Sequence, residues 1–297
     1  MSRSPRAPRA PRAALAVTAA ALVVVSLSAC SGSSSATGAS SDAQTFNPMA
    51  DRLAGDPLTA VRAAADITGH NGFLKDTTTL HTASASKQMT LHGTGAYDYA
   101  DHLGKLSVDV PPGAGTSATG QLNEVTSPGI VYMQNSGAKV PKGKWIKLGV
   151  QQLGDGNLVS SGATDPASAS DALRGAQTAT LVGTSTVDGV VLKHYKGTLD
   201  LSEAAKATGG PGGTGLDVAA HTFTVKKVPY DVWLDAHGRI AKVVEVFTFS
   251  QVPGSTVAKD QVQVTSTSVF SDFGTPVAIA VPADQDIVGP SAAPSGK

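Results

Sequence analysis

Short segments of strand-like sequence follow one another along the middle of the chain and constrain its fold more than any other feature. In the segment 228–235, apolar residues occupy every second position: Val228, Tyr230, Val232 and Leu234. Such alternation places the apolar side chains on one face of a strand, so it predicts a sheet with an apolar face. We expect strands over residues 78–86, 88–99, 103–110, 121–125, 130–134, 144–148, 178–187, 190–199, 228–235, 239–250 and 261–273.

The connections between the expected strands favour antiparallel pairing. Asp188-Gly189 is a strong signal for a two-residue hairpin, and the short segment 236–238 joins another pair of strands. The 32 glycines and 17 prolines suit a chain with many turns better than a helical bundle. About ten antiparallel strands with a few short helices indicate an α+β fold built on one large, strongly curved sheet.

Two segments carry the chemistry of a helix start. Asp56-Pro57 and Asp165-Pro166 each place a capping carboxylate before a proline at the first helical position, and apolar residues then follow at helical spacing. A third short turn is expected over residues 202–207, before a pair of glycines. All three segments are short and rich in alanine, so the predicted cover of the sheet is thin.

The apolar sheet face and its thin cover leave two possibilities open. Either the core is loosely filled or encloses a hydrophobic cavity, or the sheet and helices form a well-packed core without one. Strand and helix periodicity selects the residues that would line such a cavity. These candidates are Leu58, Val61, Ala65, Ala169, Ala172, Leu173, Val191, Tyr195, Leu199, Tyr230, Val232 and Leu234.

The first thirty residues have the features of a secretory signal peptide. Four arginines and no acidic residue precede an apolar stretch, 13–27, that is shorter than the roughly 20 residues of a spanning helix. The segment Leu27-Ser28-Ala29-Cys30 resembles the lipobox of bacterial lipoproteins, in which the cysteine is lipidated and becomes the new N-terminus. Cys30, the only cysteine, is therefore the expected lipidation site. The alternatives are an ordinary signal peptide or an uncleaved anchor.

These features divide the chain into four expected parts: a leader (1–29), a lipidated cysteine with a flexible tether (30–50), one folded domain (51–284) and a disordered tail (285–297). The whole chain has 23 basic and 23 acidic residues. Four of the basic residues lie in the leader, so the mature chain has 19 basic residues against 23 acidic ones, a formal charge of about −4. Attachment to an anionic membrane is thus expected to depend on the lipid at Cys30 rather than on charge.

Several motifs together resemble those of the LppX/LprG group of actinobacterial lipoproteins, within the LolA-type lipid-carrier superfamily. Besides the lipobox, they are GTGAYD at 93–98, GKWIKL at 143–148, TVDGV at 186–190, HYKGTLD at 194–200 and VPYDVWLDAHG at 228–238. The resemblance covers residues 56–281 and consists of turns and strand edges. It implies an antiparallel half-barrel, with helices capping its concave face and an apolar pocket between them that holds lipid acyl chains. No pocket residue of that family is carried over to this chain.

Other classes of function have weaker support. The zero net charge argues against a nucleic-acid binder, and the seven dispersed histidines form no HExxH motif. No GxSxG elbow is present, so we expect neither an enzyme nor a cofactor. The segment 210–215 formally matches GxGxxG and is interpreted as a flexible loop, while 98–102 is interpreted as a hairpin with solvated side chains. Trp145 and Trp233 are expected on the sheet surface.

Two hypotheses about function remain. The first is a monomeric lipoprotein at the extracytoplasmic face of the cell membrane that binds acyl chains of a lipid or glycolipid for transfer or envelope lipid handling. Each buried methylene contributes about 0.8 kcal/mol, so one long chain is held about as well in a pocket as in the bilayer. The second is a sensory or scaffold lipoprotein that binds a protein partner through the same fold.

Overall fold

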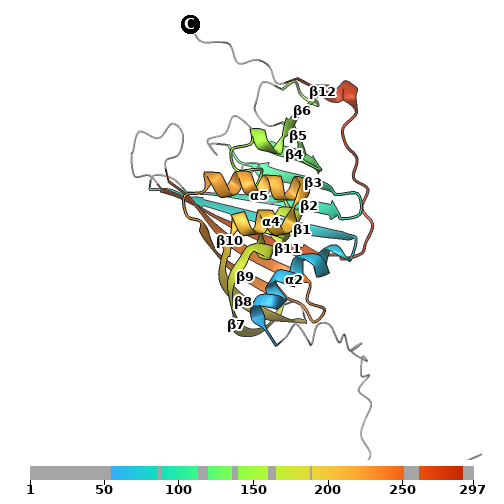
Figure 1. Ribbon diagram of the computed structural model, residues 1–297. Coiled ribbons are helices and arrows are strands. Elements are labelled where there is room, and N and C mark those ends of the chain that lie inside the picture. The colour runs from blue at the N-terminus through green and yellow to red at the C-terminus, as the bar shows by residue number, and fades with distance from the viewer. Residues whose placement is uncertain are drawn as a thin grey trace, which may run out of the picture. The chain divides into compact units, whose positions relative to one another are not determined.

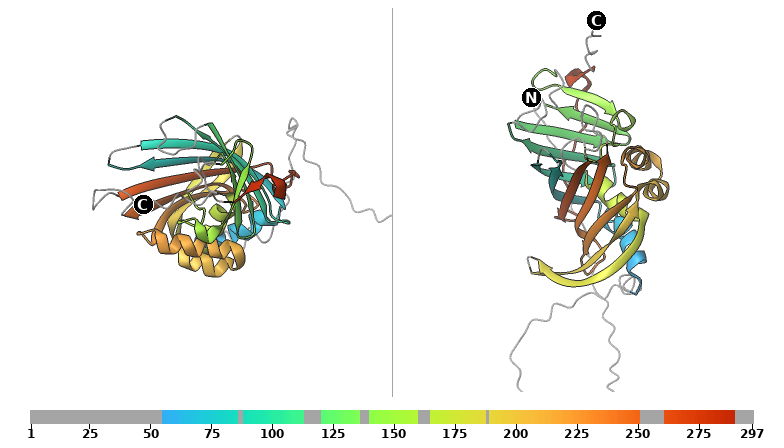
Figure 2. Two further views of the ribbon diagram at one scale, coloured as in Figure 1. Left: turned by 90° about the horizontal axis from the view of Figure 1, so that it is seen from above. Right: turned by 90° about the vertical axis from the view of Figure 1, so that its left-hand side faces the viewer.

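The expected strands form one large sheet in the computed structural model, which describes residues 55–85, 88–112, 120–135, 140–159, 165–187, 189–250 and 261–289. The strands are β1 (Phe73–Ala83), β2 (Gln88–Asp98), β3 (Leu103–Val110), β4 (Gly120–Ser127), β5 (Ile130–Gln134), β6 (Trp145–Gly149), β7 (Ala176–Val187), β8 (Val190–Asp200), β9 (Lys227–Leu234), β10 (Ile240–Ser250), β11 (Gln261–Ser271) and β12 (Ile287–Val288). The described residues thus confirm an α+β fold with a curved, predominantly antiparallel sheet (Figures 1 and 2).

The order of the strands shows that the sheet consists of two meanders joined along one seam. It runs β12-β6-β5-β4-β3-β2-β1-β11-β10-β9-β8-β7, so each meander follows the chain and β1 pairs with β11. At the seam, residues 75–83 of β1 lie antiparallel to residues 263–271 of β11. The short strand β12 pairs with β6 in parallel. The first strand begins at Phe73 rather than at residue 78 as expected. The buried Asp76 interrupts the alternation of apolar residues in this segment, so the sequence pattern did not indicate a strand there.

Helices lie on the concave side of the sheet, and the first begins as the sequence predicts. The α-helices are α2 (Pro57–Gly69), α3 (Pro166–Ala172), α4 (Leu201–Thr208) and α5 (Gly210–Thr222), and the 3₁₀ turns are η1 (Val150–Gln152), η2 (Leu173–Gly175) and η3 (Asp284–Asp286). The Asp56 carboxylate accepts hydrogen bonds from the backbone N–H groups of Leu58 and Thr59, which satisfies two donors at the start of α2. Figure 2 shows the sheet curving around α4 and α5.

Helix α5 is a correction to the sequence analysis, in which residues 210–215 were expected to form a flexible loop. Glycine costs roughly 1 kcal/mol in a helix interior, so four glycines near its start disfavour a helix. Packing outweighs this preference, because Leu216 and Ala219 are fully buried against the core. Gly213 allows close contact with α4: a Cβ atom there would lie 2.6 Å from the carbonyl oxygen of Ala205.

The main apolar core lies between the concave face of the sheet and these helices. Its fully buried members come from both, including Leu74 of β1, Phe247 of β10, Val61 of α2 and Ala172 of α3. A second, smaller cluster forms at one end of the sheet from Val131, Met133 and Ile146. The concave face also buries two carboxylates, those of Asp76 and Glu245, whose oxygens have no hydrogen-bond partner among the described residues.

On the opposite face of the sheet, three side chains on neighbouring strands stack across the register. The rings of His194 (β8) and Trp233 (β9) lie 4.2 Å apart and nearly parallel, and the Lys242 ammonium group (β10) lies 4.6 Å from the Trp233 ring. His194 also hydrogen-bonds Asp231 at 2.6 Å. Trp233 therefore anchors the sheet surface, as its polar sequence neighbours predicted.

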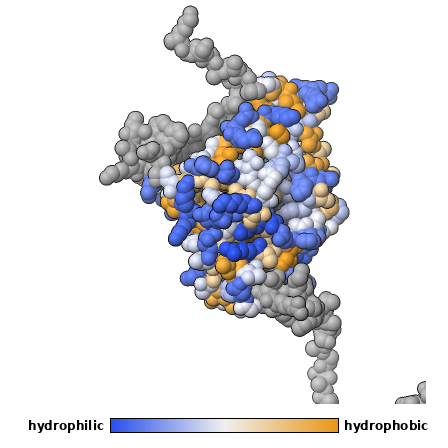
Figure 3. Space-filling model, in the orientation of Figure 1, coloured by the Kyte–Doolittle hydropathy of each residue, from blue (hydrophilic) through white to orange (hydrophobic). Residues whose placement is uncertain are grey.

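The edge hairpin formed by β7 and β8 extends beyond the helices and exposes apolar side chains. They are Leu181, Val182, Val187, Val190 and Val191. On the face of the molecule seen in Figure 3, hydrophobic and hydrophilic residues are interspersed. The described helices contain no segment long and apolar enough to cross a membrane.

Candidate functional site

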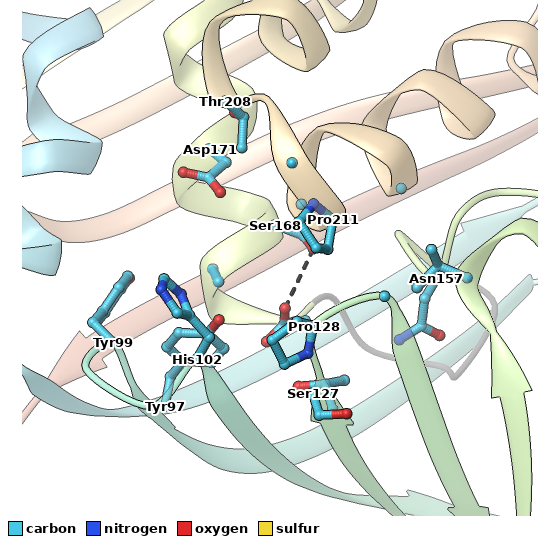
Figure 4. A pocket seen from close by; sticks show the side chains of 18 of the residues that line it. Tyr97, Tyr99, His102, Ser127, Pro128, Asn157, Ser168, Asp171, Thr208 and Pro211 are labelled. Carbon is cyan, nitrogen blue, oxygen red and sulfur yellow. Dashed lines mark hydrogen bonds between the residues drawn. The ribbon is translucent and has the colours of Figure 1, made fainter.

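A pocket of about 580 Å³ opens where the ends of the central strands meet the helices (Figure 4). Its walls come from the end of α2, the start of α3, the junction of α4 and α5, and the residues that end β2 and join β4 to β5. The volume lies within the range of roughly 300–1,000 Å³ typical of small-molecule sites. The pocket therefore brings together segments that are far apart in the sequence.

Charged side chains concentrate on the helical wall of the pocket. Arg174 donates from one Nη atom to Asp66 at 2.6 Å and from Nε to Asp171 at 2.9 Å. Burial raises the pKa of Asp171, and Arg174 opposes that rise. Among the described residues, this guanidinium is the only Lys or Arg group that lines the pocket, and both of its ion pairs are with residues of the pocket wall.

Asp165 lines the pocket at the position where α3 begins. Its carboxylate accepts a hydrogen bond from Ser168, yet burial raises its pKa to about 6. The sheet comes close at this point, because a Cβ atom on Gly104 would lie 3.3 Å from Asp165 Oδ1 and 2.3 Å from Thr126 Oγ1. Glycine at position 104 thus lets the side chain of Thr126 pack against the backbone of β3, where a larger residue would clash with it.

Two tyrosines form the aromatic part of the wall. The rings of Tyr97 and Tyr99 meet edge to face, with their centroids 4.8 Å apart. The Tyr99 hydroxyl lies 3.3 Å from the hydroxyl of Ser170 on α3, and burial raises the pKa of both tyrosines. Figure 4 places these rings beside His102, below the helical residues Asp171 and Thr208.

The remaining wall combines apolar side chains, bare backbone and the polar side chains of Thr126, Ser127, Asn157 and Thr208. Tyr97 belongs to the main core, Val131 belongs to the second core cluster, and Val150 packs against that cluster. Glycines occupy seven lining positions: Gly69, Gly129, Gly156, Gly209, Gly210, Gly212 and Gly215. The lining is therefore amphipathic: it combines carboxylates from the helical segments with apolar side chains from both the helices and the sheet, among them Ala65 and Val131.

Of the twelve residues that the sequence predicted to line a cavity, Ala65 alone lines the pocket. Leu58 packs at the edge of the main core, and nine others lie inside that core: Val61, Ala169, Ala172, Leu173, Tyr195, Leu199, Tyr230, Val232 and Leu234. Val191 is 59% exposed, because it lies at the tip of the β7–β8 hairpin, about 26 Å along the strand from the helix-covered end at Leu199. Cys30 lies outside the described residues.

The polar segment 98–102 forms the hairpin turn between β2 and β3, as expected, but only part of it is solvated. Asp98 is buried and accepts hydrogen bonds from the backbone N–H groups of Ala100 and Asp101, while Tyr99 and His102 line the pocket. In the sequence, the density of polar residues in this segment was the available signal of a site. The alternation of apolar residues along the strands does not show which loops the helices cover, so it could not place the segment at the pocket. The described residues contain no cluster of three or more histidine, cysteine or carboxylate side chains able to hold a metal ion.

The fold and the pocket define a class: a helix-covered, curved antiparallel sheet with an amphipathic pocket under the cover. Among solved structures, LprF from Mycobacterium bovis is similar, with a TM-score of 0.41, 13% identity and coverage of 80% of this chain and 98% of that one. The Mycobacterium tuberculosis lipoprotein LppX has a TM-score of 0.41 and 12% identity, covering 75% of this chain and 97% of that one. A LolA superfamily protein from Nitrosomonas europaea has a TM-score of 0.32 and 11% identity, covering 73% and 92%.

LprF, LppX and a LolA superfamily protein are thus among the solved structures to which this chain is similar. At these identities the likeness concerns the fold alone. No protein-family profile matches the chain, and no curated protein does.

Proposed function

We propose that this chain is a membrane-anchored extracytoplasmic lipoprotein that binds a lipid, with an acyl chain against the apolar interior, for lipid transfer or envelope lipid handling. The observation that carries the proposal is the amphipathic lining of the pocket, which combines the carboxylates of Asp66, Asp165 and Asp171 with apolar side chains such as those of Ala65, Ile130 and Val131. A ligand that fills such a space has one polar and one apolar end. The lipobox-like segment ending at Cys30 adds the means of attachment.

Loading requires the helical cover to separate from the sheet, since the main core is closely filled with buried side chains. The pocket lies at the border where this separation would begin. Helix α5 is the weakest part of that border, because glycine fills four of its first six positions and its N-terminus has no side-chain cap. Each methylene that enters contributes about 0.8 kcal/mol, which offsets its loss from the bilayer.

Native mass spectrometry of residues 31–297, purified without detergent, tests lipid binding. The expected result is a co-purified lipid, together with saturable binding of a fluorescent fatty acyl probe. The variant Ala167→Trp fills the pocket from α3 and should weaken probe binding about tenfold or more. Ala207→Trp, on the exposed side of α4, is the matched control and should bind normally.

The second candidate function, a lipoprotein that binds a protein partner, is favoured by the exposed apolar residues of the β7–β8 hairpin. The same experiment separates the two. A folded protein that retains no lipid and binds no acyl probe would exclude the lipid-binding function and leave the partner-binding one.

A further inference from the structure

We propose that the tip of the β7–β8 hairpin is a membrane-contact site, whose apolar side chains enter the surface of the phospholipid bilayer to which the chain is attached. The inference rests on the membrane location proposed above. It adds a second, reversible point of contact beside the lipid anchor and does not involve the pocket.

The hairpin carries most of the exposed apolar side chains in the part of the chain that the structure describes. Eight large apolar residues are exposed there, and five of them belong to this hairpin, with exposures of 47–59%. They are Leu181, Val182, Val187, Val190 and Val191. Clustered apolar side chains in water mark a surface that contacts another molecule or a membrane.

The tip projects from the rest of the sheet. Within the described residues, the pairing of β8 with β9 ends at Lys193, whereas its pairing with β7 continues to Val190. The last rungs of the hairpin therefore form a two-stranded ribbon, and Figure 2 shows it reaching away from the helices. A projection of this kind can enter a surface that the body of the domain does not touch.

The tip is apolar on both of its faces. Val190 and Val191 are successive residues of β8, so their side chains point to opposite faces of the ribbon. They are 49% and 59% exposed. A protein that docks on one face would bury one of these valines and leave the other in water. A bilayer surrounds whatever enters it and buries both, so the two-sided exposure favours a membrane as the partner.

The charges near the tip fit an anionic membrane surface. Strand β7 contains no charged side chain, and residues 190–192 of β8 contain none either. The first charged residues that follow on β8 are Lys193 and Lys196, which are both exposed and form no ion pair within the described part of the chain. The carboxylate opposite Lys196 in the register, that of Asp231, is already hydrogen-bonded to His194. Lysines beside an anionic lipid surface strengthen attachment to it.

The positions of the charges also set the depth of the contact. Lys193 follows Val190 by about 10 Å along the strand, so it meets the lipid phosphates when the tip enters only the outer part of the bilayer. Asp188 lies in the sequence between the two strands, and a carboxylate is costly in the hydrocarbon interior. The tip is therefore confined to the head-group layer and the adjoining ends of the acyl chains.

The chain between the expected anchor and the fold is long enough to allow this contact. Residues 31–54 separate Cys30 from the start of the described chain and can span up to about 80 Å. Helix α2 is held to the start of β7, where Arg62 Nε donates to the carbonyl oxygen of Ala176 at 2.8 Å. Val187 lies at most about 36 Å farther along β7. An anchored chain keeps the hairpin concentrated at the membrane, so a weak contact is sufficient.

Vesicle flotation of residues 31–297, which lack the anchor, tests the contact. The vesicles contain phosphatidylglycerol and phosphatidylcholine in equal amounts, and we expect part of the protein to float with them. Replacement of three tip valines by serine should weaken binding at least about tenfold, because their burial is lost: Val187→Ser, Val190→Ser and Val191→Ser. The matched control replaces three valines outside the hairpin that are 39–41% exposed and should bind normally: Val225→Ser, Val269→Ser and Val281→Ser.

Two further measurements fix the orientation of the tip. Lys193→Gln should weaken binding to these vesicles about fivefold and leave binding to pure phosphatidylcholine vesicles unchanged. Residues 31–297 contain no cysteine, so Thr186→Cys provides a single labelling site beside the tip. An environment-sensitive fluorophore there should shift to shorter wavelength when vesicles are added. The same fluorophore at Gln121→Cys, an exposed position on β4 in the other meander, should not shift.

The inference is wrong if the folded protein does not float, if the tip and control variants bind alike, or if the label at position 186 does not shift. A dimer that forms without vesicles and is lost in the tip variant, or a stoichiometric protein crosslinked through position 186, would in the absence of flotation assign the tip to a second copy or to a protein partner. Binding of the acyl probe keeps the proposed function separate. None of the three tip valines lines the pocket, so the tip variant should bind the probe normally whether or not it floats.

Discussion

Asp76 and Glu245 show how single residues on the concave face control the stability of the fold. Both carboxylates are buried among strands, and burial raises the pKa of each to about 8. In the unfolded chain these groups lose their protons near pH 4, whereas the folded chain keeps them until near pH 8. The folded state therefore binds more protons in this range, and the free energy of unfolding falls as the pH rises from about 4 to about 8.

We expect Asp76→Asn and Glu245→Gln each to flatten this pH dependence and to stabilise the protein at pH 8 by about 1 kcal/mol or more, since one unit of pKa corresponds to about 1.4 kcal/mol. Urea unfolding at pH 5 and pH 8 measures the change. Asp109→Asn, which replaces an exposed carboxylate, should behave like the unsubstituted protein. Equal slopes with pH in all four proteins would contradict the assignment.

Among the elements, helices α2 and α5 form a natural comparison because each is 13 residues long. Both helices have a proline in their first two positions, but α2 begins with the Asp56 cap, whereas α5 has no side-chain cap and four glycines at its start. At up to about 1 kcal/mol per glycine, the first two turns of α5 should open far more readily.

Hydrogen exchange measured by mass spectrometry checks this expectation. Amides in the first half of α5 should exchange at least about tenfold faster than those in the middle of α2. The second half of α5, which buries Leu216 and Ala219, should be slower and serves as an internal control. Equal protection of the amides of both helices against exchange would contradict the proposal that the helical cover opens at α5.

The elements also show what the sequence could predict. Alternation and turn residues predicted nearly all the strands, because both are local signals: β8 and β9 begin and end close to the expected positions. The helix α5 was missed because its stability comes from contacts with α4 and the core rather than from its own residues. The same limit applies to the pocket. Tyr97, Asp165 and Thr208 lie far apart in the sequence, and only the packing of the loops brings them together.

At the scale of the whole molecule, attachment is expected to depend on one atom, the sulfur of Cys30. The variant Cys30→Ser should lose metabolic labelling with an alkyne analogue of palmitate and should leave the detergent phase on phase separation. A lipid anchor with several acyl chains holds far more firmly than a single chain, so the shift should be nearly complete. Ser26→Ala, a change within the apolar stretch, is the control and should keep the label. Unchanged labelling of Cys30→Ser would refute lipidation at this cysteine.

The seam between β1 and β11 has a consequence for the order in which this protein can be made. Residue 75 pairs with residue 271, so the two meanders cannot join until nearly the whole folded part of the chain is available. Sheets dominated by such distant pairings fold slowly. For a chain exported N-terminus first, as proposed, this delay leaves the β1 edge of the first meander unpaired while the later strands are still crossing the membrane. The last long strand to emerge, β11, joins the two meanders and so completes the sheet against which the helices pack.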